Sequence, residues 1–354
     1  MLNALPFLIM GAAAIAAAVT GPGSGLLPLL SLGPAFAAVS SGLRKTTVVG
    51  IVALGLCVLI ALDQRISGLG QDSFDIATVA GVTAAAVLAS SVRQRREREL
   101  AEIQAIAEVA QQVLLGPVPH EVGSVQLAVR YMSAASRARI GGDLYEVVAG
   151  LGGLRLIIGD VQGKGLAAVK TAATVLGTFR EVAYDAADLG TIADRIEISL
   201  RRQLTDEQFV TAILAQVCTS GSQIELLNCG HPPPLLADGC GSAARFVESA
   251  GRNLPLGLAH LVNERRHQTT VPFGPGDQML FYTDGLSEAR DKSGSFFTLA
   301  LGGSDGDDTD PGGVLDRLSS DVIRHVGHAL ADDAAMLLVR HDGRRPAAVP
   351  VPVI

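Results

Sequence analysis

The stretch LRLIIGDVQGKG, residues 154–165, places an aspartate at the end of an apolar segment. Leu154–Gly159 is typical of a buried strand, Asp160 ends it, and a turn with two glycines leads into a predicted helix. The stretch MLFYTDGLSEARD, residues 279–291, repeats the strand end with Asp284 and a following glycine. Because glycine lets the backbone approach a ligand closely, both aspartates are candidate ligand-binding residues.

Two further acidic positions share this setting. Asp143 follows a pair of glycines, and Asp332 and Asp333 begin the last apolar segment. Carboxylates without neighbouring histidine or cysteine ligands suit hard cations such as Mg²⁺ and Mn²⁺. A single aspartate beside a glycine is usually a turn residue or a helix cap, whereas four at strand ends in one domain favour a metal site. The sequence does not show whether the four side chains converge.

The order of the elements predicts the fold class. Strands are predicted at Val125–Tyr131, Leu154–Gly159, Phe209–Cys218, Gln223–Cys229, Gln278–Thr283 and Ala334–Arg340. Helices are predicted at Gly165–Ala183, Leu189–Leu204 and Pro311–Val326. Consecutive strands joined by short turns, as at 219–222, indicate mainly antiparallel sheets with helices packed outside, which is an α+β fold.

Seven segments resemble the successive motifs of one protein family. They are SAASRARIGGDLYEV, LIIGDVQGKG, FVTAILAQV, LLNCGHPPPLL, LPLGL, MLFYTDGLSEARD and ADDAAMLLVR. Each alone is a weak signal, but they occur in the family's order across residues 128–340. This ordered set resembles the SpoIIE/RsbU-type branch of the metal-dependent protein phosphatases, the PPM or protein phosphatase 2C-like family.

The resemblance implies two packed antiparallel sheets flanked by helices and a site with two Mn²⁺ or Mg²⁺ ions. Asp160 matches the ligand that bridges the ions, and the backbone carbonyl of Val161 matches its neighbour. Asp284 and Asp332 match the ligands of the second ion. Asp143 matches the aspartate of the first motif, a ligand or a holder of metal-bound water. The neighbour of Asp332, Asp333, is then expected to be structural.

The same resemblance implies hydrolysis of phosphoserine or phosphothreonine on a separate partner protein by a water that the two ions activate. The family often acts on anti-sigma-factor antagonists, which makes such a protein the expected partner. The alternative is a membrane receptor or scaffold with an inactive phosphatase-like domain, although all four metal-matching aspartates are present.

Two basic side chains near these motifs allow more than one interpretation. Lys164 lies between two glycines and is either a contact for substrate phosphate or a solvent-facing loop residue. The spacing around it differs from that of a phosphate-binding P-loop. His231 lies at the exit of a predicted hairpin, where we expect a structural role.

The first 92 residues predict a membrane anchor of about four helices. Four apolar runs, with almost no charge, occupy Leu2–Thr20, Leu26–Val39, Thr46–Leu62 and Ile76–Val92. A spanning helix needs about 17 to 25 apolar residues, so the second run, which also contains two prolines, is the doubtful one. A cleaved signal peptide is a weak alternative for the first run because further apolar runs follow it.

The distribution of basic residues predicts the orientation of this anchor. Arg93, Arg95, Arg96 and Arg98 follow the fourth run, and Arg44 and Lys45 precede the third. The loop at 63–75 instead carries three aspartates and one arginine. The positive-inside rule then places the segment after residue 92 in the cytoplasm and predicts a multi-pass protein of the cell membrane.

Residues 93–119 predict a helical linker between this region and a phosphatase-like domain at 120–341. Apolar residues recur at heptad spacing through 100–114, and Gly116 and Pro117 end the helix. The apolar stripe either pairs with a second subunit, giving a homodimer, or packs on the following domain. In either case the helix is placed to pass a membrane signal towards the catalytic residues.

Composition excludes several other classes of protein. The formal net charge of -7, four tyrosines and no tryptophan argue against a nucleic-acid-binding surface. The spacing of the four cysteines does not match a zinc knuckle or a redox pair, so we expect reduced thiols. The acidic stretch at 304–313 is predicted to be a loop, and 342–354 a disordered tail.

Overall fold

The structure is a computed structural model in which two compact units are distinguished, Met1–Glu102 and Ile103–Ile354. Each unit is described by itself below. The described residues are 4–20, 26–66, 72–133, 141–150, 153–203, 208–218, 222–239, 244–262, 265–301, 310–328 and 330–343. Outside them lie residues 219–221 of the predicted turn at 219–222, residues 304–309 of the predicted acidic loop at 304–313, Cys240, and residues 344–354 of the predicted tail at 342–354.

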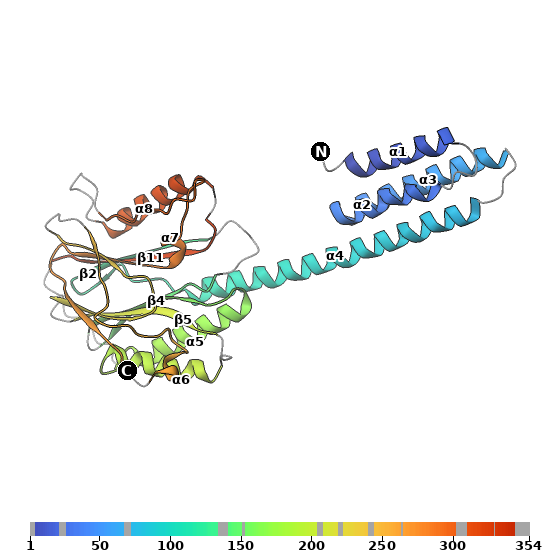
Figure 1. The fold of residues 1–354 in the computed structure, drawn as a ribbon. Coiled ribbons are helices and arrows are strands. Elements are labelled where there is room, and N and C mark those ends of the chain that lie inside the picture. The colour runs from blue at the N-terminus through green and yellow to red at the C-terminus, as the bar shows by residue number, and fades with distance from the viewer. Residues whose placement is uncertain are drawn as a thin grey trace. The chain divides into compact units, whose positions relative to one another are not determined.

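The N-terminal unit is helical. Its helices are α1 (Leu5–Thr20), the 3-10 helix η2 (Leu27–Ser31), α2 (Leu32–Ser40), α3 (Leu43–Ile66) and the first part of α4 (Asp72–Leu114) (Figure 1). Small and medium side chains pack between them, among them Met10, Leu30, Ala53, Cys57 and Val79. Many larger apolar side chains point outward instead, including Phe7, Ile15, Ile51, Leu59 and Leu88.

Two helices of the described residues are long and apolar enough to cross a membrane. The first is Leu43–Leu62 within α3, and the second is the part of α4 that begins at Ser73. The apolar helices Leu5–Ala17 and Leu27–Ser40 are shorter. Length and composition alone are a weak indication, since other helices meet the same criteria. The described residues of the four predicted apolar runs are therefore mainly helical, but the first two helices fall below a spanning length.

Arg93 fixes the end of α2 beside α4. Its guanidinium donates hydrogen bonds to the backbone carbonyl oxygens of Val39 at 2.6 Å and Ser41 at 2.5 Å. These carbonyls end α2, where a helix leaves its last acceptors unpaired. The residue predicted to mark the membrane boundary thus also closes a helix of the N-terminal unit.

The C-terminal unit contains two antiparallel sheets. The first has the strand order β1-β2-β11-β10-β7-β8 and the second the order β3-β4-β5-β6-β9. The first-sheet strands are β1 (Glu121–Val122), β2 (Val125–Met132), β7 (Leu235–Ala237), β8 (Arg245–Phe246), β10 (Gln278–Tyr282) and β11 (Ala334–His341). The second-sheet strands are β3 (Leu144–Gly150), β4 (Gly153–Val161), β5 (Val210–Cys218), β6 (Gln223–Cys229) and β9 (Thr269–Pro272).

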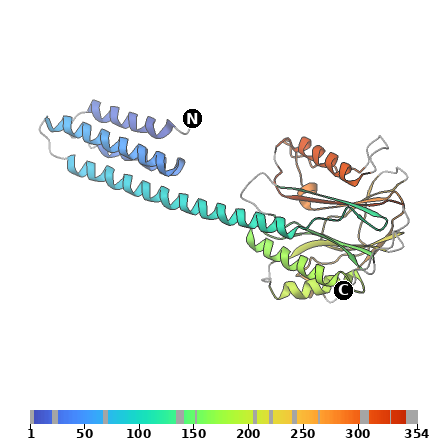
Figure 2. The same ribbon diagram turned by 180° about the vertical axis from the view of Figure 1, so that it is seen from behind.

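Helices cover the outer faces of both sheets, as Figures 1 and 2 show from opposite sides. Helix α8 (Pro311–Val326) packs on β2 and β11, while α5 (Leu166–Val182) and α6 (Leu189–Arg201) cover the second sheet. The 3-10 helix η3 (Ala259–Leu261) and the short helix α7 (Asp284–Ser287) complete the unit. The predicted α+β fold with two packed antiparallel sheets is confirmed.

The core between the sheets follows from alternation along the strands. Leu156 and Ile158 of β4 point into the core shared with the first sheet, where they join Phe281 and Leu337. The intervening Ile157 points to the other face and packs beneath α5 and α6. Successive side chains of a strand point to opposite faces, so a strand buried on both sides must be apolar throughout. Leu156–Ile158 of β4 meet this requirement, and the buried Arg155 is instead paired by hydrogen bonds to Gln216, Ala183 and Ala186.

The predicted strands and helices of this unit are confirmed with small shifts at their ends, but five strands were missed. Four of them, β1, β7, β8 and β9, contain two to four residues and are too short for a periodic signal. The fifth, β3, follows Asp143 directly and pairs with β4, with Leu144 opposite Gly159. Its polar Glu146 and its terminal glycine obscure the strand pattern.

The end of α4 packs on its own unit rather than only forming a linker. Ala107 is fully buried against Val169 of α5, with Leu114 beside them. Arg180 of α5 donates a hydrogen bond to the Leu114 carbonyl at 2.7 Å. Part of the predicted heptad stripe is therefore used within the domain.

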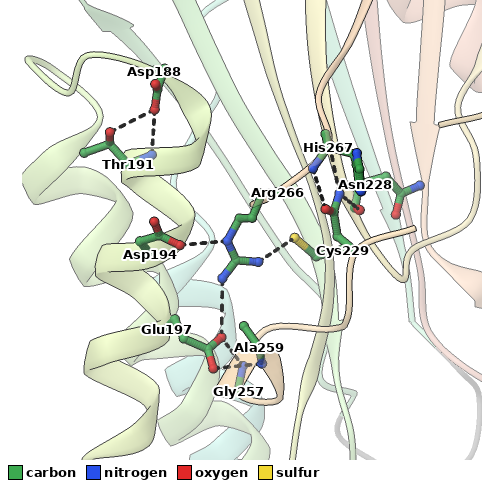
Figure 3. A network of polar contacts seen from close by, with 11 residues as sticks. Asp188, Thr191, Asp194, Glu197, Asn228, Cys229, Gly257, Ala259, Arg266 and His267 are labelled. Atoms are coloured by element: carbon green, nitrogen blue, oxygen red, sulfur yellow. Dashed lines mark hydrogen bonds and ion pairs between the residues drawn. The ribbon is translucent and has the colours of Figure 1, made fainter. Parts of the chain in front are cut away.

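A buried polar network attaches the loop after β8 to α6 (Figure 3). The Arg266 guanidinium lies 2.8 Å from an Asp194 carboxylate oxygen and 3.6 Å from one of Glu197. Glu197 also accepts hydrogen bonds from the backbone N–H groups of Gly257 at 2.7 Å and Ala259 at 3.1 Å. The LPLGL segment that these bonds hold pairs in turn with the first residue of β5 through Leu256. The network thus braces the strand next to Asp160.

Removing Glu197 is expected to destabilise the protein strongly. Glu197→Ala leaves Arg266 and two N–H groups without a buried acceptor, which costs about 2–4 kcal/mol. At about 2–4 °C per kcal/mol for a domain of this size, the midpoint of thermal unfolding should fall by roughly 4–16 °C. Circular dichroism of the full chain in detergent measures it.

Asp194→Ala is the matched control. The Asp194 side chain pairs with the same Arg266 guanidinium, but it is 68% exposed. An exposed ion pair contributes about 1 kcal/mol or less, so its midpoint should change by only a few degrees. Equal shifts for the two variants would contradict the assignment of Glu197 as the buried acceptor.

Candidate functional site

The predicted aspartates lie where corresponding ends of the two sheets meet. Asp143 directly precedes β3, and Asp160 lies at the end of β4. The strands β3 and β4 pair with each other. In the other sheet Asp284 follows β10 and Asp332 precedes β11, which are also neighbours. Antiparallel pairing explains the arrangement, because the end of one strand lies beside the start of the next. The sheet topology therefore gathers residues that are up to 189 positions apart in the sequence.

Thr283 connects the two sheets at this point. Its hydroxyl donates a hydrogen bond to Oδ2 of Asp143 at 2.8 Å and accepts one from the backbone N–H of Ala335 at 2.9 Å. The side chain is fully buried, so both bonds are sheltered from water. Thr283 thereby fixes the Asp143 carboxylate relative to Asp284, the next residue in the chain.

The carboxylates influence one another strongly. Burial, followed by the charge of Asp160, raises the pKa of Asp143 well above its usual range. Burial and the charges of Asp284 and Asp332 raise the pKa of Asp160 to about 7. Burial, then Glu288 and Asp332, raise that of Asp284. Like charges that are close and poorly solvated disfavour ionisation, so these side chains form one electrostatic group.

Lys164 lies at the edge of this group. Its Nζ atom is 2.6 Å from Oδ2 of Asp332, and both side chains are partly exposed. Its positive charge opposes the rise in the pKa of Asp160 and of Asp284. The loop lysine therefore contacts a predicted metal ligand rather than facing solvent alone.

Asp333 differs from its neighbour Asp332 in every contact. It is buried, and its Oδ2 atom accepts hydrogen bonds from the Tyr131 hydroxyl at 2.7 Å and from the Gly141 N–H at 2.9 Å. The Tyr131 hydroxyl in turn accepts one from Gln111 of α4 at 2.9 Å. These bonds give Asp333 a structural role and leave Asp332 on the open side.

Sequence reasoning missed Thr283, Tyr131 and Gln111. Thr283 is a polar residue directly before Asp284 in an otherwise apolar strand, and that position could have marked it. Tyr131 and Gln111 offer no comparable signal, because a tyrosine in a strand and a glutamine in a helix are ordinary. Their role depends on a contact between segments that only the fold brings together.

Two glycines make the close packing at the site possible. A Cβ atom on Gly142 would lie 2.4 Å from the Val161 carbonyl oxygen and 2.8 Å from Oδ1 of Asp160. A Cβ atom on Gly285 would lie 1.8 Å from the Asp333 carbonyl oxygen. Real Cβ atoms do not approach other atoms this closely, so only glycine fits. Gly142 thus leaves open the two oxygen ligands predicted for a metal.

His231 ties the sheets together below the site. Its Nδ1 atom lies 3.2 Å from the Thr211 hydroxyl, and its Nε2 atom lies 3.0 Å from the Tyr282 carbonyl oxygen. Burial lowers the pKa of His231 to about 4, so the ring is neutral near pH 7. The predicted structural role agrees with these contacts.

The donor set fits hard divalent cations. Four carboxylates and the Val161 carbonyl supply oxygen ligands, which Mg²⁺ and Mn²⁺ prefer, and their mutual repulsion is relieved by a cation. Among the residues that the structure describes, no three side chains of histidine, cysteine, aspartate or glutamate form a ready-made cage around one point. The fit therefore rests on the chemistry of the donors and on the space that Gly142 leaves beside them.

Removing one charge should stabilise the metal-free protein. The folded-state pKa of Asp160 is above its ordinary value of 3.8, so its stabilising contribution is present at low pH and is lost as pH rises through about 7. In EDTA at pH 8, Asp160→Asn should raise the thermal midpoint by roughly 2–8 °C, for about 1–2 kcal/mol of relieved repulsion. The difference should shrink at pH 5, where wild-type Asp160 is protonated.

Asp316→Asn provides the control for this measurement. Asp316 is exposed and its pKa is lowered by the Arg130 hydrogen bond, so its charge is favourable. This variant should not raise the midpoint at pH 8. A lower midpoint for Asp160→Asn than for wild type in EDTA would argue against electrostatic strain at the site.

Comparison with known proteins identifies the family. A family model described as Stage II sporulation protein E (SpoIIE) matches residues 151–342, more than half of the chain. The SiaA-PP2C domain of Pseudomonas aeruginosa is 16% identical, with a TM-score of 0.54, over 69% of this chain and 98% of that one. The RsbU and RsbW domains of Rv1364c from Mycobacterium tuberculosis are 23% identical, with a TM-score of 0.50.

The second match covers 64% of this chain and 62% of the solved one, so the shared part is less than two thirds of that protein. At these identities the structures establish the fold, and the matched SpoIIE region contains Asp160, Asp284 and Asp332. The chain belongs to the SpoIIE family, and its C-terminal unit has the fold of a PP2C domain.

Proposed function

We propose that this protein is an active, metal-dependent protein serine/threonine phosphatase that hydrolyses phosphoserine or phosphothreonine on a partner protein. The observation that carries the proposal is the gathering of Asp143, Asp160, Asp284 and Asp332 at the meeting ends of the two sheets. Their pKa shifts indicate a site that a cation would stabilise. Family membership supports the reaction class.

Two Mn²⁺ or Mg²⁺ ions would be held by oxygen ligands. Asp160 would bridge them, the Val161 carbonyl would be a neighbouring ligand, and Asp284 and Asp332 would hold the second ion. Asp143 would serve as a ligand or hold a bound water. Such a pair of ions lowers the pKa of water towards neutrality and offsets charge on the phosphoryl group.

The remaining residues position these ligands and the substrate. Thr283 orients Asp143 through a buried hydrogen bond, and Asp333 with Tyr131 fixes the start of β11 beneath Asp332. Lys164 is partly exposed on a turn between two glycines of positive φ. This turn gives it the reach to contact a substrate phosphate at the edge of the site.

The family resemblance and the N-terminal sequence support the partner and the location that we propose. The family resemblance favours an anti-sigma-factor antagonist as the phosphoprotein. The lengths of α3 and α4 and the outward apolar side chains of the N-terminal unit support a multi-pass anchor in the cell membrane. The basic cluster at 93–98 then places the phosphatase domain in the cytoplasm.

A homodimer through residues 100–114 is also part of the proposal. Ala107 and Leu114 pack within the domain, but Ile103, Ile106 and Val113 of the same helix remain exposed. Exposed apolar side chains along one helix are typical of a surface that pairs with another helix.

Hydrolysis of a serine phosphopeptide by the full-length protein in detergent tests the function. Wild type should release phosphate with Mn²⁺ or Mg²⁺ and stop with EDTA. Asp160→Ala and Asp332→Asn should lower the rate by about 10³-fold or more, because metal catalysis contributes several kcal/mol and each 1.4 kcal/mol is a factor of ten. Asp316→Asn, at a remote exposed ion pair, should retain the rate.

The alternative of a receptor or scaffold with an inactive domain makes the opposite prediction. It is supported if wild type binds Mn²⁺ with normal affinity and releases no phosphate from any phosphoserine or phosphothreonine peptide. That result would overturn the proposed activity.

A further inference from the structure

Lys164 places a positive charge among the predicted metal ligands. Its Nζ atom lies 2.6 Å from Oδ2 of Asp332, a short distance that is typical of a charge-assisted hydrogen bond. Burial and neighbouring carboxylates raise the pKa of Asp160 to about 7 and also raise that of Asp284, and the Lys164 charge opposes both rises. One ammonium group therefore offsets charge at the three carboxylates that are expected to bind the second cation.

The Asp332 carboxylate has a partner on each of its oxygens. Oδ1 accepts a hydrogen bond from the Asp333 N–H at 3.0 Å, and Oδ2 pairs with Lys164. The first bond comes from the main chain directly before β11 and fixes the carboxylate. The second comes from a flexible side chain that is 37% exposed, so it is the partner that can exchange. A divalent cation on Oδ2 would lie close to the ammonium group, and two cations that share one carboxylate oxygen repel each other strongly.

The turn that carries Lys164 gives the side chain room to leave. Its start is held by a hydrogen bond from the Gln162 N–H to the Phe209 carbonyl oxygen at 3.0 Å. Beyond this bond, Gly163 and Gly165 have φ angles of 103° and 78°, which favour glycine. A Cβ atom on either glycine would meet no atom of the described residues within 4 Å. The lysine is therefore carried by a turn that is anchored at its base and open around its tip.

We propose that Lys164 and the second divalent cation are alternative partners of Asp332, so that the lysine side chain leaves Asp332 when the cation binds. The inference rests on the proposed phosphatase function and adds to it a control of metal loading. With the cation bound, the Lys164 ammonium group turns outward, where a substrate phosphate can replace Asp332 as its partner. The lysine thus sets the concentration of cation that is needed to complete the site.

Titration with Mn²⁺ measures this competition without reference to activity. The full-length protein in detergent is first freed of metal with EDTA and desalted, and free Mn²⁺ is then counted by its electron paramagnetic resonance signal. Lys164→Gln should tighten the weaker of the two Mn²⁺ affinities by about three- to tenfold, because a partly exposed ion pair no longer competes with the cation. Lys164→Arg, which keeps the charge, should bind Mn²⁺ as wild type does.

Thermal unfolding provides a second readout under two conditions. In EDTA, Lys164→Gln loses the ion pair with Asp332, so its midpoint should fall by roughly 2–4 °C below that of wild type. In saturating Mn²⁺ this difference should disappear, because tighter binding of the cation compensates for the lost ion pair. A lysine with a purely structural role would instead lower the midpoint equally under both conditions.

Lys292→Gln is the matched control for the loss of charge alone. Lys292 lines a cavity of about 600 Å³ that Asp284 and Asp332 also line, so this variant removes the same charge beside the same carboxylates. Its weaker Mn²⁺ affinity should stay near the wild-type value at physiological ionic strength, where charges that do not touch the cation are screened.

Binding and phosphate release together separate this inference from the proposed function. The inference is overturned if Lys164→Gln binds Mn²⁺ with the wild-type affinities, if its midpoint is lowered equally in EDTA and in Mn²⁺, or if Lys292→Gln tightens binding as much. Each of these results leaves the proposed function intact, provided that wild type releases phosphate from a phosphopeptide with Mn²⁺. If wild type binds no Mn²⁺, the proposed metal-dependent function falls, and this inference falls with it.

Discussion

Asp143 is buried and Asp160 is partly buried, and loss of a proton is unfavourable at both. Burial raises both pKa values first, followed by the charge of Asp160 at Asp143 and by the charges of Asp284 and Asp332 at Asp160. Much of the C-terminal unit serves to keep them there. The two sheets bring their strand ends together, Thr283 fastens Asp143, and glycines allow backbone to pack within contact distance of the carboxylates. A protein retains such repulsion where the site has a use for it.

Further buried contacts hold the aspartates in place. His231 joins β5 to β10 as a neutral ring, and Asp333 is satisfied by Tyr131 and Gly141. The Glu197–Arg266 network braces the loop that pairs with β5 next to Asp160. These groups are buried and hydrogen-bonded to one another. Their bonds offset the electrostatic free energy that the crowded aspartates add to the folded state.

The sequence predicted the long elements well. β4, α5, α8 and β11 have strong apolar periodicity and clear ends, such as Pro311 at the start of α8 and Gly327 after it. The aspartates stood out in the sequence because Asp143 follows a glycine, Asp160 and Asp284 end apolar strands, and Asp332 precedes one. Their convergence could not be read from the chain, since it depends on the pairing of β3 with β4 and of β10 with β11. The short strands carried too few residues to show a pattern.

The positioning residues were harder to predict for the same reason. Gln111, Tyr131 and Asp333 are distant in sequence, and each is an ordinary residue in its own segment. The cavity beside Asp284 likewise combines a loop after α7 with the end of α8. Features made by contacts between segments become visible only in the fold, whereas features made within one segment are visible in the sequence.

We expect the four aspartates to bind two divalent cations. Anomalous diffraction at the manganese edge, from crystals of the protein grown with Mn²⁺, tests it most directly. We predict two anomalous peaks within coordination distance of Asp160, one of them also contacting Asp284 and Asp332. Crystals with bound Mn²⁺ but no peak at Asp160, or with a peak only elsewhere on the surface, would contradict the account.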